Sequence, residues 1–288
     1  MAVIKTENLT YIYGEGTPFE KRAVDDVSLE IGEGEIIGVI GHTGSGKSTL
    51  IQHFNGLLKP SSGSVYIDGE KLWEDKARLR AIRFKVGLVF QYPEYQLFEE
   101  TCYKDIAFGP KNMGLSDAEI DERIKETAKM VGLSPELLDK SPFELSGGQK
   151  RRVAIAGVMA MRPKVLILDE PASGLDPKGR EYILGMLKDY HTATKSTVMI
   201  VSHSMEDVAR YADRILVMNK AKLYCLEETE KVFSRSEELM SMGLSVPQIT
   251  RVFARLKEMG IEFNKDVYTT PYAVKLLLER LGQKEGLA

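Results

Sequence analysis

The fold of this 288-residue chain is constrained most by a five-residue motif and the two segments on either side of it. Residues 145–149 read Leu-Ser-Gly-Gly-Gln. Before them, the apolar run at 35–40 enters a loop at 41–48 that reads Gly-His-Thr-Gly-Ser-Gly-Lys-Ser. After them, residues 164–170 form a second apolar run that ends in Asp-Glu. A buried strand that enters such a glycine loop and continues as a helix predicts a nucleoside triphosphate site.

Strand-like and helix-like patterns alternate along most of the chain. Strands are expected at 3–13, 24–31, 35–40, 64–69, 85–90, 165–168, 197–201 and 214–218, and helices at 48–56, 178–190 and 205–211. This alternation predicts an α/β fold, in which a mainly parallel sheet has helices on both faces. Residues 97–158 interrupt it with helical patterns that include a capping box at 116–119, so they are expected to form their own lobe.

Composition excludes several classes of function. The net charge is -3, from 39 basic and 42 acidic residues, and this gives no general electrostatic case for binding nucleic acid. Cys102 and Cys225 are the two cysteines, too few and too far apart for a disulfide framework or a metal cluster. No run approaches the ~20 apolar residues that a membrane span needs. A role at a membrane is therefore expected to depend on a partner.

The glycine loop has the residues that triphosphate binding requires. Glycines let the backbone N–H groups close around phosphates, and the helix that follows adds the positive end of its dipole. Lys47 is expected to hold the β and γ phosphates, Ser48 to offer its hydroxyl to Mg²⁺, and Thr49 to support the phosphates. Asp169 ends a buried strand and would hold the ion through its water shell. The whole predicted segment comprises Gly41, His42, Thr43, Gly44, Ser45, Gly46, Lys47, Ser48 and Thr49.

With all these motifs in order, residues 1 to about 222 resemble the nucleotide-binding subunit of an ATP-binding cassette (ABC) transporter. The resemblance implies a RecA-like core with a mainly parallel sheet, an N-terminal antiparallel β subdomain and a helical subdomain at about 97–158. Residues 223–288 would then be a small C-terminal helical appendage, expected to serve dimerisation. Apolar residues at helical spacing in 249–259 and a helix beginning at Thr270-Pro271 fit such an appendage.

The resemblance also implies a role for each polar residue near the triphosphate, with ATP as substrate and Mg²⁺ as cofactor. Glu170 would be the general base that orients the attacking water, and His203 would hydrogen-bond the γ phosphate. Gln91 would contact Mg²⁺ and the water, which makes Ser48, Gln91 and Asp169 the metal set. Tyr13 would stack on adenine, but Tyr11 lies on the same face of an ideal strand. Either tyrosine could instead belong to the core.

In this family the Leu-Ser-Gly-Gly-Gln motif acts on the ATP of the opposite subunit, so one copy is half of a site. The motif comprises Leu145, Ser146, Gly147, Gly148 and Gln149. A second loop, of Ser173, Gly174, Leu175 and Asp176, would cross between the subunits. ATP is then expected to favour the closed dimer and ADP the open one.

The sequence of residues 90–101 and the short appendage resemble the energy-coupling factor (ECF) branch of vitamin and metal importers. Residues 90–101 read Phe-Gln-Tyr-Pro-Glu-Tyr-Gln-Leu-Phe-Glu-Glu-Thr. Within that branch they resemble the second of two paired ATPases. This implies a heterodimer with a homologous ATPase on the cytoplasmic face of the cell membrane, as a peripheral protein. The pair would lie under a transmembrane coupling protein that carries substrate-binding membrane subunits.

The same segment suggests a docking surface. Its apolar members are Tyr92, Tyr95, Leu97 and Phe98, and its acids are Glu94, Glu99 and Glu100. An apolar groove rimmed by acids would accept a short helix that bears arginine. The alternative is that the aromatic residues belong to the core and the acids to ordinary solvated surface.

Two other functions compete with an ECF ATPase. One is the ATPase of a non-ECF ABC importer. Only the sequence of residues 90–101 and the appendage argue against it. The other is a soluble ABC protein of DNA repair or the ribosome, which usually carries long coiled coils, zinc cysteines or two cassettes.

One departure from the family is Ala221, where many relatives have glycine in a hairpin turn. Alanine tolerates positive φ less well, so an altered local turn is expected.

Overall fold

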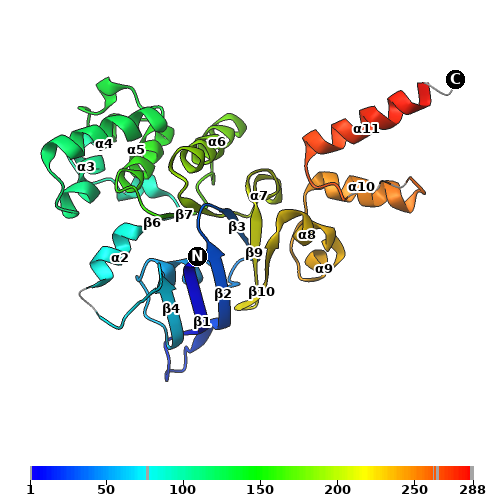
Figure 1. The fold of residues 1–288 in the computed structure, drawn as a ribbon, viewed down its shortest axis with the longest axis horizontal. Coiled ribbons are helices and arrows are strands. Elements are labelled where there is room, and N and C mark those ends of the chain that lie inside the picture. Colours follow the sequence, from blue (N-terminus) through cyan, green and yellow to red (C-terminus); the bar gives the residue numbers. More distant parts are fainter. Residues whose placement is uncertain (1, 76–77, 262, 264–265, 286–288) are drawn as a thin grey trace.

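The computed structural model describes residues 2–75, 78–261, 263 and 266–285, with side chains as far as 280. The appendage predicted at 223–288 therefore lies partly outside the described residues. Within them, the chain builds two sheets, a helical lobe and a C-terminal group of helices (Figure 1). The α/β fold predicted from the alternating patterns is confirmed.

A six-stranded sheet with the order β10-β9-β3-β8-β7-β6 forms the centre of the molecule. Its neighbouring strands are parallel, apart from the antiparallel pair of β9 and β10. Nearly every residue of the parallel strands is buried, as expected for strands covered on both faces. The strands are β3 (Ile36–Ile40), β6 (Val86–Val89), β7 (Val165–Asp169), β8 (Thr197–Val201), β9 (Arg214–Asn219) and β10 (Lys222–Glu228).

Alternate residues of these strands enter two different cores, which shows that both faces are covered. On β7, Leu166 and Leu168 pack in one core with side chains of α5 (Gly147–Met159) and α6 (Pro177–Thr194), among them Leu187. Val165 and Ile167 pack in the other core with α1 (Lys47–Phe54) and the second sheet. A third core, around α7 (Met205–Tyr211), covers the β9 end of the sheet.

The second sheet is antiparallel and has the order β2-β1-β4-β5. Its strands are β1 (Ala2–Tyr13), β2 (Lys21–Gly32), β4 (Ser62–Ile67) and the short β5 (Glu70–Lys71). The predicted N-terminal antiparallel subdomain is thus present, and it shares a core with α1. This contact brings the end of β1 beside the helix that follows the glycine loop.

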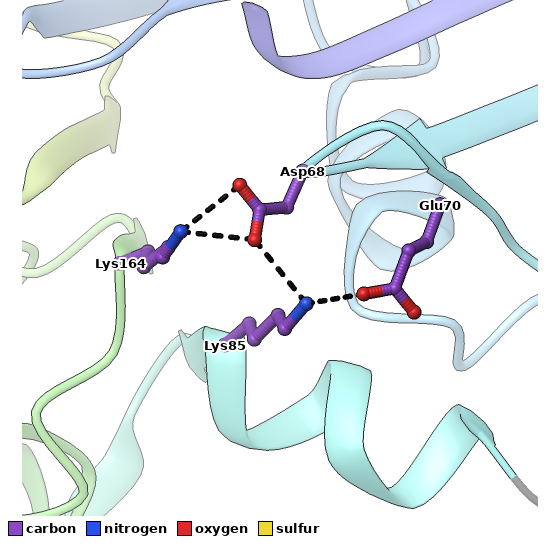
Figure 2. A network of polar contacts seen from close by, with 4 residues as sticks. All are labelled: Asp68, Glu70, Lys85 and Lys164. Atoms are coloured by element: carbon purple, nitrogen blue, oxygen red, sulfur yellow. Dashed lines mark hydrogen bonds and ion pairs between the residues drawn. The ribbon is translucent and has the colours of Figure 1, made fainter.

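An ion-pair network ties the antiparallel sheet to the central sheet (Figure 2). Asp68, in the turn between β4 and β5, accepts hydrogen bonds of 2.9 Å from Lys164, which precedes β7. Lys85, at the end of α2 (Leu79–Lys85), donates to Asp68 at 3.2 Å and to Glu70 at 2.6 Å. The bonds from Lys164, more than those from Lys85, hold the pKa of Asp68 below its usual value. The two sheets are therefore joined by charge as well as by packing.

The helical lobe lies between β6 and β7 in the chain and consists mainly of α3 (Cys102–Asn112), α4 (Asp117–Met130) and α5 (Gly147–Met159). The capping box at the start of α4 is confirmed, with Ser116 as its N-cap. After Ser134 the chain forms a single 3-10 turn, η3 (Pro135–Leu137). Two other 3-10 turns, η2 (Pro93–Gln96) and η4 (Pro142–Glu144), precede α3 and α5.

The residues after the sheet form α8 (Thr229–Ser234), α9 (Ser236–Ser241), α10 (Gln248–Glu258) and α11 (Thr270–Glu285). α8 and α9 pack against the central sheet, whereas α10 and α11 extend away from it (Figure 1). Both extended helices expose apolar side chains, including Val252, Val274 and Leu278, and Met259 is exposed directly after α10. Among the described residues, no helix has the length and apolarity to cross a bilayer.

The turn between β9 and β10 does not show the alteration expected from Ala221. Lys220 and Ala221 have φ of 47° and 67°, so alanine takes the left-handed conformation that glycine favours. Backbone bonds hold it there, since Ala221 N donates to Ser45 O at 3.1 Å and Asp25 N donates to Ala221 O at 2.8 Å. The turn therefore lies against the glycine loop.

Candidate functional site

The glycine loop connects β3 to α1 and is compressed against its neighbours. Gly46 has φ of 101°, and a Cβ built on it would come within 2.2 Å of Ala23 O, so only glycine fits. Lys47 folds back over the loop and donates to Gly41 O at 2.7 Å and to His42 O at 3.1 Å. Burial lowers the pKa of Lys47, although Glu170 and Asp169 oppose that change.

A cavity of about 160 Å³ opens beside the loop. Tyr13 lines it with 41% of its surface exposed, and its hydroxyl lies 3.3 Å from Thr49 Oγ1. Tyr11 instead packs against the core, with its ring edge-on to Tyr13 and to His53. A register shift between Tyr11 and Ile12 breaks the ideal alternation of the strand. The structure thus places Tyr13, and not Tyr11, at the cavity.

Lys21 is a cavity residue that the sequence reasoning did not identify. It pairs with Tyr13 across β1 and β2, so both residues reach the same opening. Its signal in the sequence is weak, because the pairing register depends on the bulge in β1. Together with Lys47, it adds positive charge to a cavity whose other walls are glycines, hydroxyl residues and Ala23.

The acid pair lies where β7 ends. Asp169 is the last residue of the strand and is 8% exposed. Burial raises its pKa, while a hydrogen bond with Ser48, and next the charge of Lys47, oppose that rise. Glu170 has φ of 53°, and its N–H donates to Val201 O at 3.0 Å. This left-handed turn directs Glu170 away from the line of the strand.

Glu170 is held in an unusual electrostatic state. Burial raises the pKa of its carboxyl to about 7, and a hydrogen bond from the backbone N–H of His203 partly opposes that rise. His203 Nε2 lies 3.3 Å from Glu170 Oε1, but outside hydrogen-bond geometry, so that oxygen has no donor among the described residues. Burial likewise lowers the pKa of His203. A largely buried carboxylate that keeps one oxygen free of hydrogen bonds is suited to accept a proton from water.

Gln91 and His203 reach the same edge of the sheet by following neighbouring strands. Gln91 comes two residues after the end of β6, and His203 two residues after the end of β8. Because β6, β7 and β8 are parallel, their carboxyl ends meet at the edge that carries Asp169. Gln91 is exposed and makes no hydrogen bond to the acid pair within the described structure.

The oxygen donors at this edge suit Mg²⁺. Ser48, Asp169 and Gln91 offer hydroxyl, carboxylate and amide oxygens, which are hard ligands. The described residues contain no group of three or more His, Cys, Asp or Glu that could enclose an ion. Mg²⁺ usually keeps several waters and binds through one or two protein ligands plus substrate phosphates. The donor set therefore fits an ion that arrives with a nucleotide.

The Leu-Ser-Gly-Gly-Gln motif begins α5. Ser146 is the N-cap, and its side chain and that of Gln149 form a capping box. A Cβ on Gly147 or Gly148 would meet nothing within 4 Å, so packing inside the chain does not require glycine there. No hydrogen bond or ion pair among the described residues joins residues 145–149 to the glycine loop. The motif presents open backbone to its surroundings.

The loop after the acid pair is anchored at both ends. Ser173 N donates to Glu170 O at 3.1 Å. Asp176 caps α6 by accepting from Gly179 N at 2.8 Å. Gly174 and Asp176 are exposed between these anchors, and Leu175 packs against the core of the helical lobe. The sequence-predicted inter-subunit loop is therefore a surface feature adjacent to the acid pair.

An apolar groove of about 300 Å³ runs between η2, α3 and α5. Tyr95 and Phe98 are 84% and 60% exposed, so they do not belong to the core. The prediction that Glu94 belongs to an acidic rim of this groove is wrong, because Glu94 turns inward to pair with Arg151. The sequence reasoning also missed part of the lining, which is distributed over several elements and includes Phe84, Phe108, Val153, Val158 and Met161.

Comparisons with known proteins agree with this architecture. The profile of the family described as "ABC transporter" matches residues 24–173. The energy-coupling factor transporter ATP-binding protein EcfA2 of Clostridium tetani is 58% identical over 98% of each chain. The EcfA2 protein of Caldanaerobacter subterraneus subsp. tengcongensis is 56% identical over 96% of this chain and 97% of the relative.

Two solved structures resemble the fold. CbiO1 from Clostridium perfringens, part of the ABC transporter complex CbiONQ, gives a TM-score of 0.74 at 39% identity, over 86% of this chain and 97% of that chain. The dimeric ATP-binding cassette MJ0796, in a post-hydrolysis state bound to ADP and Pi, gives a TM-score of 0.69 at 32% identity, over 78% of this chain and 98% of that chain. The chain belongs to the ABC transporter family and, within it, to the ECF transporter ATP-binding proteins.

Proposed function

We propose a working arrangement for this member of the ABC transporter family, which is an ATP-hydrolysing subunit of an ECF transporter. Its own glycine loop and acid pair bind and cleave ATP, and its Leu-Ser-Gly-Gly-Gln motif completes the site of a second subunit. Lys47, Asp169 and Glu170 meet at one edge of the central sheet, and this observation carries the proposal most directly. The motif at 145–149 lies on a different element, at the start of α5.

At the nucleotide, the chain supplies position and charge, which are what phosphoryl transfer mainly requires. Tyr13 lies against the purine, and the loop at 41–49 surrounds the phosphates with its backbone N–H groups. Lys47 exchanges its two carbonyl partners for phosphate oxygens. Ser48, Asp169 and Gln91 hold Mg²⁺, which when bound neutralises charge that develops on the phosphates.

Glu170 is the proposed general base, with His203 as its positioning partner. The turn at Glu170 places its carboxylate beside His203 Nε2, and its free oxygen is available to a water molecule. Burial raises the pKa of Glu170 to about 7, and a base with a pKa near the working pH transfers protons efficiently. His203 remains a neutral hydrogen-bonding group, because burial lowers its pKa.

The open backbone at Gly147 and Gly148 supports a site shared between two subunits. Phosphates bind readily at a helix N-terminus with free N–H groups, and these two glycines leave that space clear. Residues 173–176 cross to the partner beside Glu170. ATP thereby links two subunits, and hydrolysis releases them.

The partners follow from the EcfA2 relatives and from the groove. We propose a heterodimer with a second ABC ATPase, on the cytoplasmic face of the membrane as a peripheral protein. A transmembrane coupling protein inserts a short helix into the groove between η2 and α5, beside the exposed Tyr95 and Phe98. Glu99 and Glu100 remain at the surface to meet arginine, whereas Glu94 is turned inward in its pair with Arg151. Glu100 would exchange its exposed ion pair with Lys104 for the arginine.

The chain divides, in this proposal, into a nucleotide-binding domain at 1–222 and a dimerisation appendage at 223–288. The exposed apolar residues of α10 and α11 supply a contact surface. β10 crosses the proposed boundary and stays in the central sheet as far as Glu228, so the appendage is attached rigidly at its start.

The test is ATP turnover by the complex purified through a tag on this chain, with and without Glu170→Gln. The variant is expected to retain bound Mg·ATP and a closed, long-lived dimer while hydrolysis falls by at least about 100-fold. Wild-type turnover in the variant would remove Glu170 from the role of base. Loss of ATP binding in the variant would contradict the assignment of binding to the glycine loop.

A further inference from the structure

Arg151 joins three segments of the chain through one buried guanidinium. The residue is 3% exposed and lies in the second turn of α5. Its Nε and Nη2 donate to the two carboxylate oxygens of Glu94 at 3.0 and 2.7 Å. Its Nη1 donates to Ser173 O at 2.7 Å and to Pro171 O at 3.3 Å. The fork of donors is thus shared between η2 and the loop that follows Glu170.

Each of these segments belongs to a different functional part of the molecule. η2 contributes Pro93 and Gln96 to the wall of the groove, so it lies beneath any helix that docks there. The loop that includes Pro171 and Ser173 follows the acid pair directly. α5 itself starts at the Leu-Ser-Gly-Gly-Gln motif and supplies the opposite wall of the groove. Arg151 is therefore where groove, acid pair and motif meet.

The contact between Glu94 and Arg151 is suited to transmit displacement. A guanidinium is planar and binds a carboxylate through two parallel bonds, so the two groups move together. Burial would raise the pKa of Glu94, but the hydrogen bonds from Arg151 hold it below its usual value. The pair thus remains ionised, and separating it would leave a buried charge without a partner.

The ends of η2 make it a short and adjustable segment. Tyr92 enters it with φ of 55°, and the side chains of Tyr92 and Tyr95 are exposed. After it, the N–H groups of Phe98 and Glu99 donate to Asp105 at 3.3 Å each. Within η2, Glu94 is the side chain with a described charged partner on another element, so a shift of η2 acts on Arg151.

We propose that Arg151 is a positioning residue that couples occupancy of the groove to the loop behind Glu170 through its bond to Glu94. This inference rests on the proposed function, since it assumes that a membrane partner docks in the groove. It assigns a route through side chains, distinct from the backbone connection that runs from Gln91 into η2. In both directions, the guanidinium transmits the shift: nucleotide at the acid pair alters η2, and pressure on η2 alters the acid pair.

The experiment is amide hydrogen exchange on the full chain, with and without Mg·ATPγS. We compare wild type, Glu94→Gln, Arg151→Lys and the control Lys125→Gln, which removes a charge from an exposed pair on α4. In wild type and control, nucleotide is expected to slow exchange at 41–49, 170–176 and 92–97. In Glu94→Gln, slowing at 92–97 should fall at least threefold while the other two segments keep theirs. Arg151→Lys should also weaken the response at 170–176.

Several outcomes separate this inference from the proposed function. Equal slowing at 92–97 in wild type and Glu94→Gln would overturn the route through Arg151, as would a wild type in which 92–97 does not respond. A wild type without slowing at 41–49 would contradict the nucleotide site itself. If Arg151→Lys does not fold, Glu94→Gln still decides, because glutamine keeps an acceptor for Arg151.

A kinetic measurement adds a readout that a purely structural role would not produce. In the purified complex, Arg151→Lys is expected to lower kcat for ATP at least tenfold and to change KM less than threefold. The reason is that Arg151 contacts the loop behind the acid pair and not the glycine loop. A rise in KM with unchanged kcat would contradict a positioning role.

Discussion

Replacing Glu170 by glutamine should stabilise the nucleotide-free chain while it abolishes hydrolysis. Burial raises the pKa of Glu170 from 4.5 to about 7, so the folded chain disfavours the ionised form. A change from 4.5 to about 7 corresponds to about 3 kcal/mol, at 1.36 kcal/mol for each tenfold change in proton affinity. The side chain is only 13% exposed, so solvent screening leaves most of this energy in place.

The sign follows from linkage. The pKa of Glu170 is higher in the folded chain than in the unfolded chain. Wild type therefore loses stability as pH rises from 4.5 to about 7, and this stability does not return at higher pH. Glutamine cannot ionise, so Glu170→Gln escapes this loss. The free energy of unfolding of the variant should therefore exceed that of wild type by about 3 kcal/mol at pH 8 but by less than about 1 kcal/mol at pH 5.

Urea unfolding of both proteins at pH 5 and pH 8, with EDTA and without nucleotide, measures the difference. The control is Glu74→Gln, which replaces an exposed acid and should change stability by less than about 0.5 kcal/mol at either pH. An advantage of Glu170→Gln that is the same at both pH values, or a variant less stable than wild type at pH 8, would refute the reasoning from burial.

Three further predictions concern other parts of the chain. Ser146→Arg places a bulky cation where Gly147 leaves open space, so hydrolysis by the complex should fall at least about 100-fold while labelled ATP binds the isolated chain within about threefold of wild type; lost binding by the isolated chain would place the motif in its own site. Asp68→Asn should cost about 1 kcal/mol at pH 7, because the ion pairs with Lys164 are partly exposed. Since that pKa is lowered, wild type keeps this contribution above pH 3.8 and loses it as pH falls further. Urea unfolding should therefore show a difference in stability between the two proteins at pH 7 that narrows as pH falls below 3.8, and a difference independent of pH would contradict the network. Ala221→Gly should raise stability by about 0.5 to 1 kcal/mol without changing KM for ATP, because glycine relieves a φ of 67°; a lower melting temperature would show that the turn is unstrained.

The sequence predicts those features that depend on short-range order. The glycine loop, the acid pair and the motif at 145–149 are contiguous, and each follows or begins a regular element whose pattern is strong. The parallel order of β6, β7 and β8 then brings Gln91, Glu170 and His203 to one edge. Adjacent parallel strands end at the same side of a sheet, so the position of each residue just after its strand was sufficient to predict that these side chains converge.

Features that depend on register or on long-range contact were missed. Tyr11 and Tyr13 could not be separated, because a bulge in β1 decides which of them faces the cavity. Glu94 was expected on a rim, whereas it pairs with Arg151, 57 residues later in the chain. Ala221 was expected to alter its turn, but bonds to two other segments hold it at positive φ. In each case tertiary contact outweighed the local preference.

The composition of the complex that this chain forms in its native membrane tests the central claim most directly. The tagged chain is recovered from detergent-solubilised membranes, and the proteins that accompany it are identified by mass spectrometry. The account predicts a second, different ABC ATPase, one transmembrane coupling protein and several small membrane subunits. Recovery with a pair of ordinary permease subunits, or with ribosomal or DNA-repair proteins from the soluble fraction, would contradict it.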